Sequence, residues 1–373
     1  MMLALLSALT LGVVLLPLLP GLREWRRPTD VAPLRIEDDD ALDPACFAHR
    51  FAKKLQRAFD AGDATLGRSV IVRAGALATG WPLSADEAAA GATRRIWCVD
   101  DGAELPPGMC FLAEVAAAGD LGTAPRGRYL ALLADGCLRL APRSLVLRWA
   151  HARDVEIGSG CRVAGRVSAE RSISVGISVR FAMLHAPEIR FVTPQNTRAA
   201  PHLSTVTGVM HAGLPRSVRI EAPSGRAVAD QTLRIEARHA WRGDLVCSGD
   251  LVLGDGCFAL GSLKARGTLS LGAGCHVAGN LFARGEIHLG AGCIVQGCVA
   301  SDTVVRLDSG CVVGTLTQPA TVAAPRIDVA PTVRVHGTVW ADDRGRARRD
   351  AVAAKLLRTN SQRAEPAALK GVA

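Results

Sequence analysis

Residues 249–266 read GDLVLGDGCFALGSLKAR, and the next three blocks repeat that pattern: GTLSLGAGCHVAGNLFAR (267–284), GEIHLGAGCIVQGCVASD (285–302) and TVVRLDSGCVVGTLTQPA (303–320). One cysteine keeps its place in every block, so Cys257, Cys275, Cys293 and Cys311 recur at an interval of 18 residues. Between the glycines, apolar residues alternate with other residues. Such alternation is typical of β-strands, because successive side chains of a strand point to opposite faces.

Each block is interpreted as one coil of a solenoid. Three short strands, turned at glycine pairs such as Gly272 and Gly274, close a triangle, and each coil stacks about 4.8 Å above the last. The sequence therefore predicts an all-β fold, a single-strand parallel β-helix with about 18 residues per coil. The inward side chains that we expect to hold it together are Leu253, Cys257, Leu271, Cys275, Leu289, Cys293, Leu307 and Cys311.

The same phase can be followed beyond the four clean copies. Residues 155–165 around Cys161 match the repeat position by position, and a slipped copy follows at 327–341. We therefore expect coils over 110–191 and 231–342. Between them, residues 192–230 contain four prolines and break the phase, which predicts an insertion.

The remaining segments have other patterns. Phe47, Phe51, Leu55 and Phe59 recur every fourth residue and predict an amphipathic helix. Shorter patterns suggest strands over 69–72 and 95–99 and a helical turn over 84–90, so 45–109 is expected to be a small α+β cap. Residues 23–44 are expected to be a polar linker, and 343–373 a basic, mobile tail that carries much of the formal net charge of +9.

The amino terminus predicts attachment to a membrane. Residues 1–22 contain no charged side chain and are long enough for a transmembrane helix, while Arg23, Arg26 and Arg27 follow directly. The positive-inside rule then places the bulk of the chain in the cytoplasm, on the inner membrane. The 11 cysteines fit this compartment as reduced core thiols, and without a Cys-x-x-Cys pair they predict no metal site.

The coil length, the phrases LGAGCHVAG (271–279) and LGAGCIVQG (289–297), the absence of a nucleotide motif and the preceding membrane segment together resemble the bactofilins. These are polymer-forming cytoskeletal proteins of bacteria. The resemblance covers chiefly 231–342 and implies a right-handed β-helix that polymerises without nucleotide or cofactor and positions envelope-associated enzymes. The chain departs from the family in its transmembrane segment, its cap and its insertion, which put unlimited polymerisation in doubt.

A β-helix ends in unpaired backbone groups, which must be capped or paired with another chain. The last predicted coil is followed only by charged residues, so Val333, Val335 and Val339 are the expected assembly end. The expected partners are other copies of the chain, the membrane through residues 1–22, and envelope-synthesis proteins through the insertion or the tail. Nucleic acid is not expected, because no aromatic stacking platform accompanies the basic tail.

The alternative is an enzyme, because hexapeptide-repeat acyltransferases form a left-handed β-helix with the same period. Counted in sixes, Leu271, Val277, Ala283 and Leu289 keep the inward position. Such an enzyme needs a general base. His276 and His288 fall on the outward phase. No acidic orienter or acceptor-binding constellation accompanies His185, His202 and His211, so no catalytic residue is assigned.

Overall fold

The computed structural model describes residues 15–16, 19–26, 43–74, 81–192, 211–215, 218–221 and 226–349. The chain divides at Asp43 into two units. In the first unit a short helix, α2, spans Leu19–Arg26. Most of the predicted transmembrane segment lies outside the described residues, and within the described ranges we find no helix whose length and apolar character would suit a bilayer.

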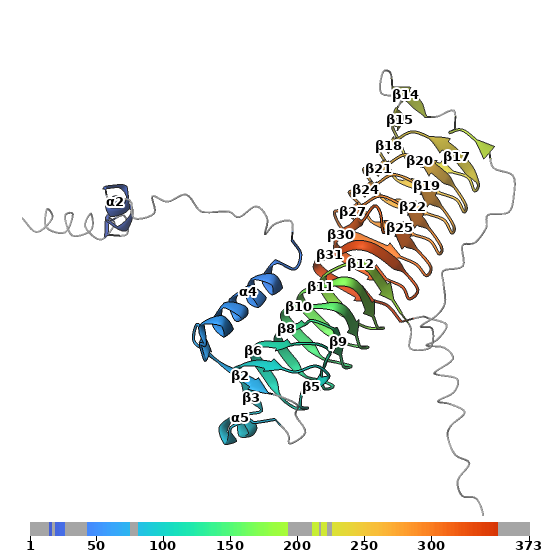
Figure 1. Ribbon diagram of the computed structural model, residues 1–373. Helices are drawn as coiled ribbons and strands as arrows, with labels where there is room; N and C mark the ends of the chain where they lie inside the picture. Colours follow the sequence, from blue (N-terminus) through green and yellow to red (C-terminus); the bar gives the residue numbers. More distant parts are fainter. Residues whose placement is uncertain are drawn as a thin grey trace, which may run out of the picture. The chain divides into compact units, whose positions relative to one another are not determined.

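The second unit is a parallel β-solenoid of about 13 turns with about 18 residues per coil, as predicted. It consists of two successive solenoids (Figure 1). The strands of the first are β1 (Thr65–Leu66), β2 (Ser69–Ala74), β3 (Ala92–Thr93), β4 (Ile96–Val99), β5 (Ala103–Glu104), β6 (Cys110–Ala117), β7 (Leu121–Gly122), β8 (Arg128–Ala134), β9 (Cys137–Leu140), β10 (Leu145–Ile157), β11 (Arg162–Val175) and β12 (Arg180–Phe191).

The second solenoid contains the clean repeats. Its strands are β13 (His211–Ala212), β14 (Arg219–Glu221), β15 (Arg226–Ala229), β16 (Leu233–Ile235), β17 (His239–Arg242), β18 (Leu245–Cys247), β19 (Leu251–Leu253), β20 (Phe258–Leu260), β21 (Leu263–Ala265), β22 (Leu269–Leu271), β23 (His276–Val277), β24 (Leu281–Ala283), β25 (Ile287–Leu289), β26 (Ile294–Val295), β27 (Val299–Ser301), β28 (Val304–Leu307), β29 (Val312–Val313), β30 (Ala320–Val329) and β31 (Arg334–Ala347).

The 18-residue period appears directly as strand register. Leu251 pairs with Leu269, and Leu269 pairs with Ile287 one coil further on. A glycine with positive φ turns the corner before each repeated cysteine, as at Gly274 and Gly292. A residue without a Cβ adopts this backbone conformation at low cost, which explains why a glycine marks these corners in the sequence.

The predicted cap requires correction, because the solenoid begins near residue 69 and not at 110. Strand β2 pairs in parallel with β4, and β4 with β6, so residues 69–74 and 92–104 already belong to coils. The predicted helix is α4, Cys46–Ala61, and it lies along the side of the first solenoid instead of closing its end. Phe51 and Leu55 pack there against Trp149. The alternating apolar pattern of these first strands covers only a few residues at a time and is interrupted by loops, so the sequence did not reveal them as coils.

Both outer ends of the rod carry their own apolar covers. At the first, α5 (Ala85–Ala90) begins with a capping box between Ser84 and Glu87, and Trp81 lies with its ring 5.0 Å from that of buried Trp97. The Trp81 Nε1 donates to the carbonyl oxygen of Glu104 at 3.2 Å. At the other end Leu214 and Val218 pack on the core. Part of the predicted insertion is therefore solenoid, since β15 pairs in parallel with β18.

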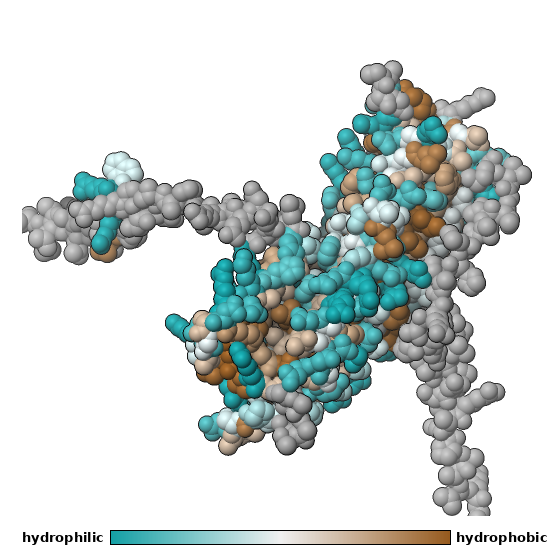
Figure 2. All heavy atoms as spheres, in the orientation of Figure 1, coloured by the Kyte–Doolittle hydropathy of each residue, from teal (hydrophilic) through white to brown (hydrophobic). Residues whose placement is uncertain are grey.

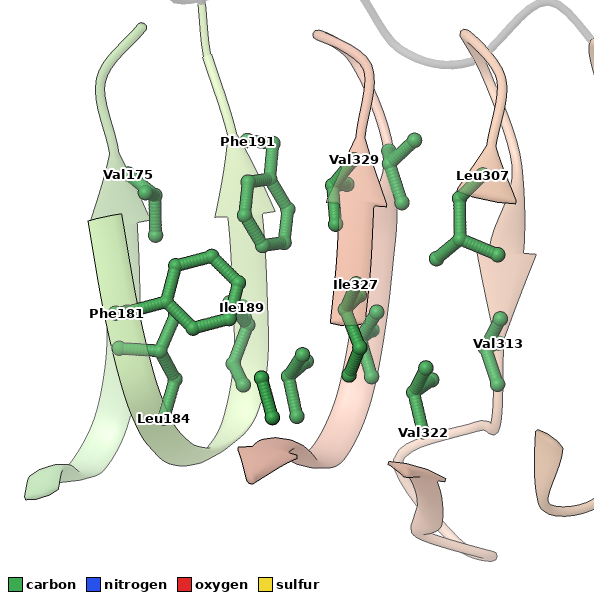
Figure 3. Packing of buried hydrophobic residues seen from close by; sticks show 14 of the residues in the cluster. Val175, Phe181, Leu184, Ile189, Phe191, Leu307, Val313, Val322, Ile327 and Val329 are labelled. Carbon is green, nitrogen blue, oxygen red and sulfur yellow. The ribbon is translucent and has the colours of Figure 1, made fainter. Parts of the chain in front are cut away.

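The two solenoids meet through their last coils, which the sequence analysis did not foresee. Strands β12 and β31 pair antiparallel, with Leu184 opposite Val339 and Ile189 opposite Val335. Figure 3 shows the cores joined here: Phe181, Ile189 and Phe191 fill the same interior as Ile327 and Val329. Val333, Val335 and Val339 are each 0% exposed.

This junction corrects the assignment of an open assembly end. The charged residues after Ala341 do not end the solenoid: β31 continues to Ala347, and its outer edge is paired by β12 of the same chain. Local sequence cannot reveal such a partner, because it lies some 150 residues earlier in the chain.

The junction predicts that Val335→Arg destabilises the fold. A charge would be buried without a partner between the two cores, at a cost of several kcal/mol. We expect a marked fall in the urea midpoint followed by circular dichroism, or loss of soluble protein. Trp340→Arg is the matched control, because Trp340 lies on the same strand with 51% of its surface exposed; equal midpoints for the two variants would contradict the enclosed junction.

Candidate functional surface

The triangular coil gives the rod three lateral faces, which we name by their outward residues. Face A carries Arg128, Arg162 and Arg180 in the first solenoid and continues with Arg346 and Asp328 in the second. Face B carries Trp149, Met183 and Trp340. Face C carries Arg139, Glu156, Arg190, Ile294 and Phe258. Each face therefore crosses the junction. The outward residues named are charged on face A, large and apolar on face B, and mixed charged and apolar on face C.

Face B is divided between a covered half and an open half. Helix α4 covers the first solenoid, where its apolar side meets Ile96, Ala131 and Trp149. Arginines hold its two ends: the guanidinium of Arg166 lies 5.1 Å from the ring centre of Phe47, and that of Arg73 lies 4.0 Å from the ring centre of Phe59. Beyond the junction, Trp340 and Phe282 remain 51% and 39% exposed. Figure 2 shows hydrophobic residues reaching the surface in this second half of the rod as well.

Beneath α4, a serine and a histidine form a buried pair. The Nδ1 of His151 lies 2.8 Å from the Oγ of Ser168, and the rings of His49 and His151 meet edge to face at 5.2 Å. Ser168 and His151 are 4% and 7% exposed. No group of three or more His, Cys, Asp or Glu side chains gathers at any point of the described ranges in a way that could hold a metal ion. Because His151 lies on β10 and Ser168 on β11, this enclosed pair is a polar contact between two neighbouring strands.

The histidines considered for the enzyme alternative lie apart from one another. His276 faces outward, packed against the Phe258 ring at 4.8 Å, and burial lowers its pKa. His288 pairs with Asp308, with Nε2 and Oδ2 2.9 Å apart. His185 contacts Thr338 across the junction, and His211 lies against His239. His202 is outside the described residues. The structure does not bring these imidazoles together into one site.

The eight core residues named from the repeat are all buried, with at most 2% of any of them exposed. The four repeated cysteines add a regular interaction. Each thiol lies within 3.0–3.2 Å of a backbone oxygen 21 residues earlier, as Cys275 does with Gly254 and Cys293 with Gly272. The thiol therefore ties the corner of one coil to the coil before it, which a methyl group of similar size could not do.

The thiols of Cys257, Cys275 and Cys293 are held in the protonated form, because their pKa values are raised in the folded protein. Burial raises the pKa of Cys161 to about 11. For Cys293, the hydrogen bond with the Cys275 thiol lowers the pKa, but the Cys311 thiol and burial outweigh it and raise the value to about 12. All 11 cysteines are free, and seven of them are buried. Buried thiols with raised pKa values are poor nucleophiles, so the ladder is a structural element.

The thiol ladder predicts a loss of stability in alkali. Because the folded pKa exceeds the unfolded one, the unfolded chain releases protons first, and the stability present below about pH 9 falls as pH rises toward 12. We expect a decline of about 1 kcal/mol per pH unit per thiol in the free energy of unfolding, measured by urea titration at pH 8, 9.5 and 11. Cys293→Ala should lower stability at pH 8 and flatten this decline; an unchanged slope would contradict the assignment.

Face A carries a column of arginines along the first solenoid and across the junction. Arg162 pairs in register with Arg180, and Arg180 pairs with Arg346, so three exposed arginines occupy consecutive coils. None of the three forms an ion pair within the described residues. The sequence analysis missed this column because it assigned the positive charge to the tail, although the 18-residue spacing of Arg162 and Arg180 would have revealed it.

Comparison with known proteins identified no matching family, curated protein or solved structure.

Proposed function

We propose that the protein is a non-enzymatic scaffold: a membrane-anchored rod that associates with further copies of itself without nucleotide and holds envelope-associated partners along its faces. The observation that carries the proposal is the junction of β12 and β31. There, two coil edges of this sequence satisfy each other by antiparallel pairing, which is the same contact that an assembly of separate rods requires. The resemblance of the repeats to bactofilins supports the same proposal.

With the two last coils joined, further association has to use other strand edges. Strand β14 offers such an edge. Among the described strands it pairs only with β15, in antiparallel fashion; all three of its residues are exposed, and Ile220 is 61% exposed. An exposed edge strand with an apolar side chain is a template for pairing with another chain. Two copies joined through β14 would form a longer rod, with the first solenoid of each copy at its outer ends.

The apolar covers bear on the size of the assembly. Trp81 and Leu83 close the first end of the rod, where α5 also lies, whereas the other end has the short cover of Leu214 and Val218 beside the open β14 edge. A rod that keeps an exposed strand edge at only one of its two covered ends favours a discrete pair over an unlimited filament. This modifies the family expectation of filaments toward a dimeric scaffold.

The test is the state of association of residues 44–373, purified under reducing conditions without nucleotide and measured by light scattering and negative-stain microscopy over a range of concentrations. We expect concentration-dependent, end-to-end pairs. Ile220→Lys should shift the dissociation constant upward at least tenfold, because it places a charge in the pairing edge. Leu316→Lys is the matched control, since Leu316 is 68% exposed but lies far along the chain between β29 and β30.

Two results would overturn the proposal. Equal association of the Ile220→Lys and Leu316→Lys variants would exclude β14 as the contact. Concentration-independent trimers that bind an acyl donor would instead support the hexapeptide-repeat acyltransferase alternative.

A further inference from the structure

The charged residues of the first solenoid are segregated between its faces. Residues 123–134, 136–153, 157–169 and 171–187 contain no aspartate or glutamate. These ranges supply face A and the corner that precedes it. The acidic side chains of the same coils lie on face C and its neighbouring corner, where Asp154 pairs with Arg171 and Glu188 lies near Arg190. On the first solenoid, face A is therefore basic, and the first acidic residue of its column is Asp328, beyond Arg346 on the second solenoid.

The arginines of face A form an ordered surface. The outward positions of five consecutive coils are Arg128, Leu145, Arg162, Arg180 and Arg346, a column about 20 Å long at the usual strand spacing. Like charges on neighbouring strands repel and destabilise a sheet. A bound anionic surface would remove this repulsion, which gives the column a physical reason to prefer an anionic partner.

The corner beside face A adds a hollow suited to phosphate. Arg126 and Arg143 hold equivalent corner positions, with φ of 62° and 63°, and Arg349 donates from Nε to the Oγ of Ser178 at 2.9 Å. These side chains line one hollow of about 650 Å³ together with Ser159 and Gly160. Three guanidinium groups and two hydroxyl groups around one hollow provide donors of the kind that bind phosphate oxygens.

A second column on face A is apolar. Two residues beyond the positions of the arginine column, Leu112 and Leu147 are 38% and 39% exposed, with half-buried Leu130 between them. A flat strip that places arginines beside exposed leucines matches a bilayer interface, where cations meet headgroup phosphates and apolar side chains enter the acyl boundary. A nucleic acid would favour an aromatic stacking platform instead, and Tyr129, the aromatic residue of β8, is fully buried.

We propose that face A of the first solenoid, with its arginine corner, binds the phosphate headgroups of an anionic membrane and lays the rod flat along the bilayer. The inference rests on the membrane-associated part of the proposed function. It adds a second, lateral contact, independent of residues 1–22 and of association through β14. The uncharged segment 1–22 followed by Arg23 and Arg26 in the same chain favours a lipid surface over other polyanions.

Vesicle sedimentation of residues 44–373 tests this contact without the apolar amino-terminal segment. All residues of the two hydrophobic cores belong to this part of the chain. With vesicles of phosphatidylcholine containing 30% phosphatidylglycerol at 0.1 M salt, we expect binding at least tenfold stronger than to phosphatidylcholine alone. The variant R162Q/R180Q/R346Q should bind at least 30-fold more weakly, because each arginine near an anionic leaflet contributes substantially to binding.

The matched control is R153Q/R242Q/R266Q, which removes the same charge from exposed positions outside face A. It should bind within twofold of the parent, and circular dichroism should show that both variants are folded. Equal weakening by the two triple variants, or binding to a short DNA duplex without binding to the anionic vesicles, would overturn the inference. Light scattering of the same samples reports association separately, so failure of the lipid contact and failure of self-assembly are distinguishable.

Discussion

The structure depends on one requirement: every coil edge in the interior of the rod has to find a backbone partner. Twelve of the strand pairings in the second solenoid repeat the 18-residue step, and each adds a layer whose backbone donors and acceptors must be paired by the next layer. At the last coil, the requirement is met by pairing β31 with β12, a strand that runs in the opposite direction. Because β12 and β31 run antiparallel, the closing layer of one solenoid serves as the closing layer of the other.

Much of the fold could be predicted from residues 249–320. The period, the inward cysteines and the glycine corners follow from local sterics, and all of these are reproduced as register and burial. The helix over 46–61 could also be predicted, from four aromatic and aliphatic residues on one side. These features share a property: each is decided by residues fewer than 20 positions apart.

What escaped prediction is decided over longer distances. The pairing of Leu184 with Val339 and the position of α4 beside Trp149 depend on surfaces that form only after the coils have stacked. The arginine column of face A could be predicted from local sequence only in part. Its members Arg162 and Arg180 obey the repeat, but Arg346 reaches the same column from the opposite direction, so its place follows only from the junction.

The reversal has a consequence for synthesis of the chain. The outer edge of β12 is complete at Phe191, yet its partner β31 ends at Ala347. At the usual elongation rates of about 5–20 residues per second, this edge stays unpaired on the ribosome for a time on the order of ten seconds. During that interval, strand β31 of a neighbouring nascent chain offers the same hydrogen bonds to β12. Close spacing of nascent chains on a polysome therefore favours a domain-swapped pair over a monomer in which β12 pairs with its own β31. The early helix α4 cannot shield the edge, because it covers face B.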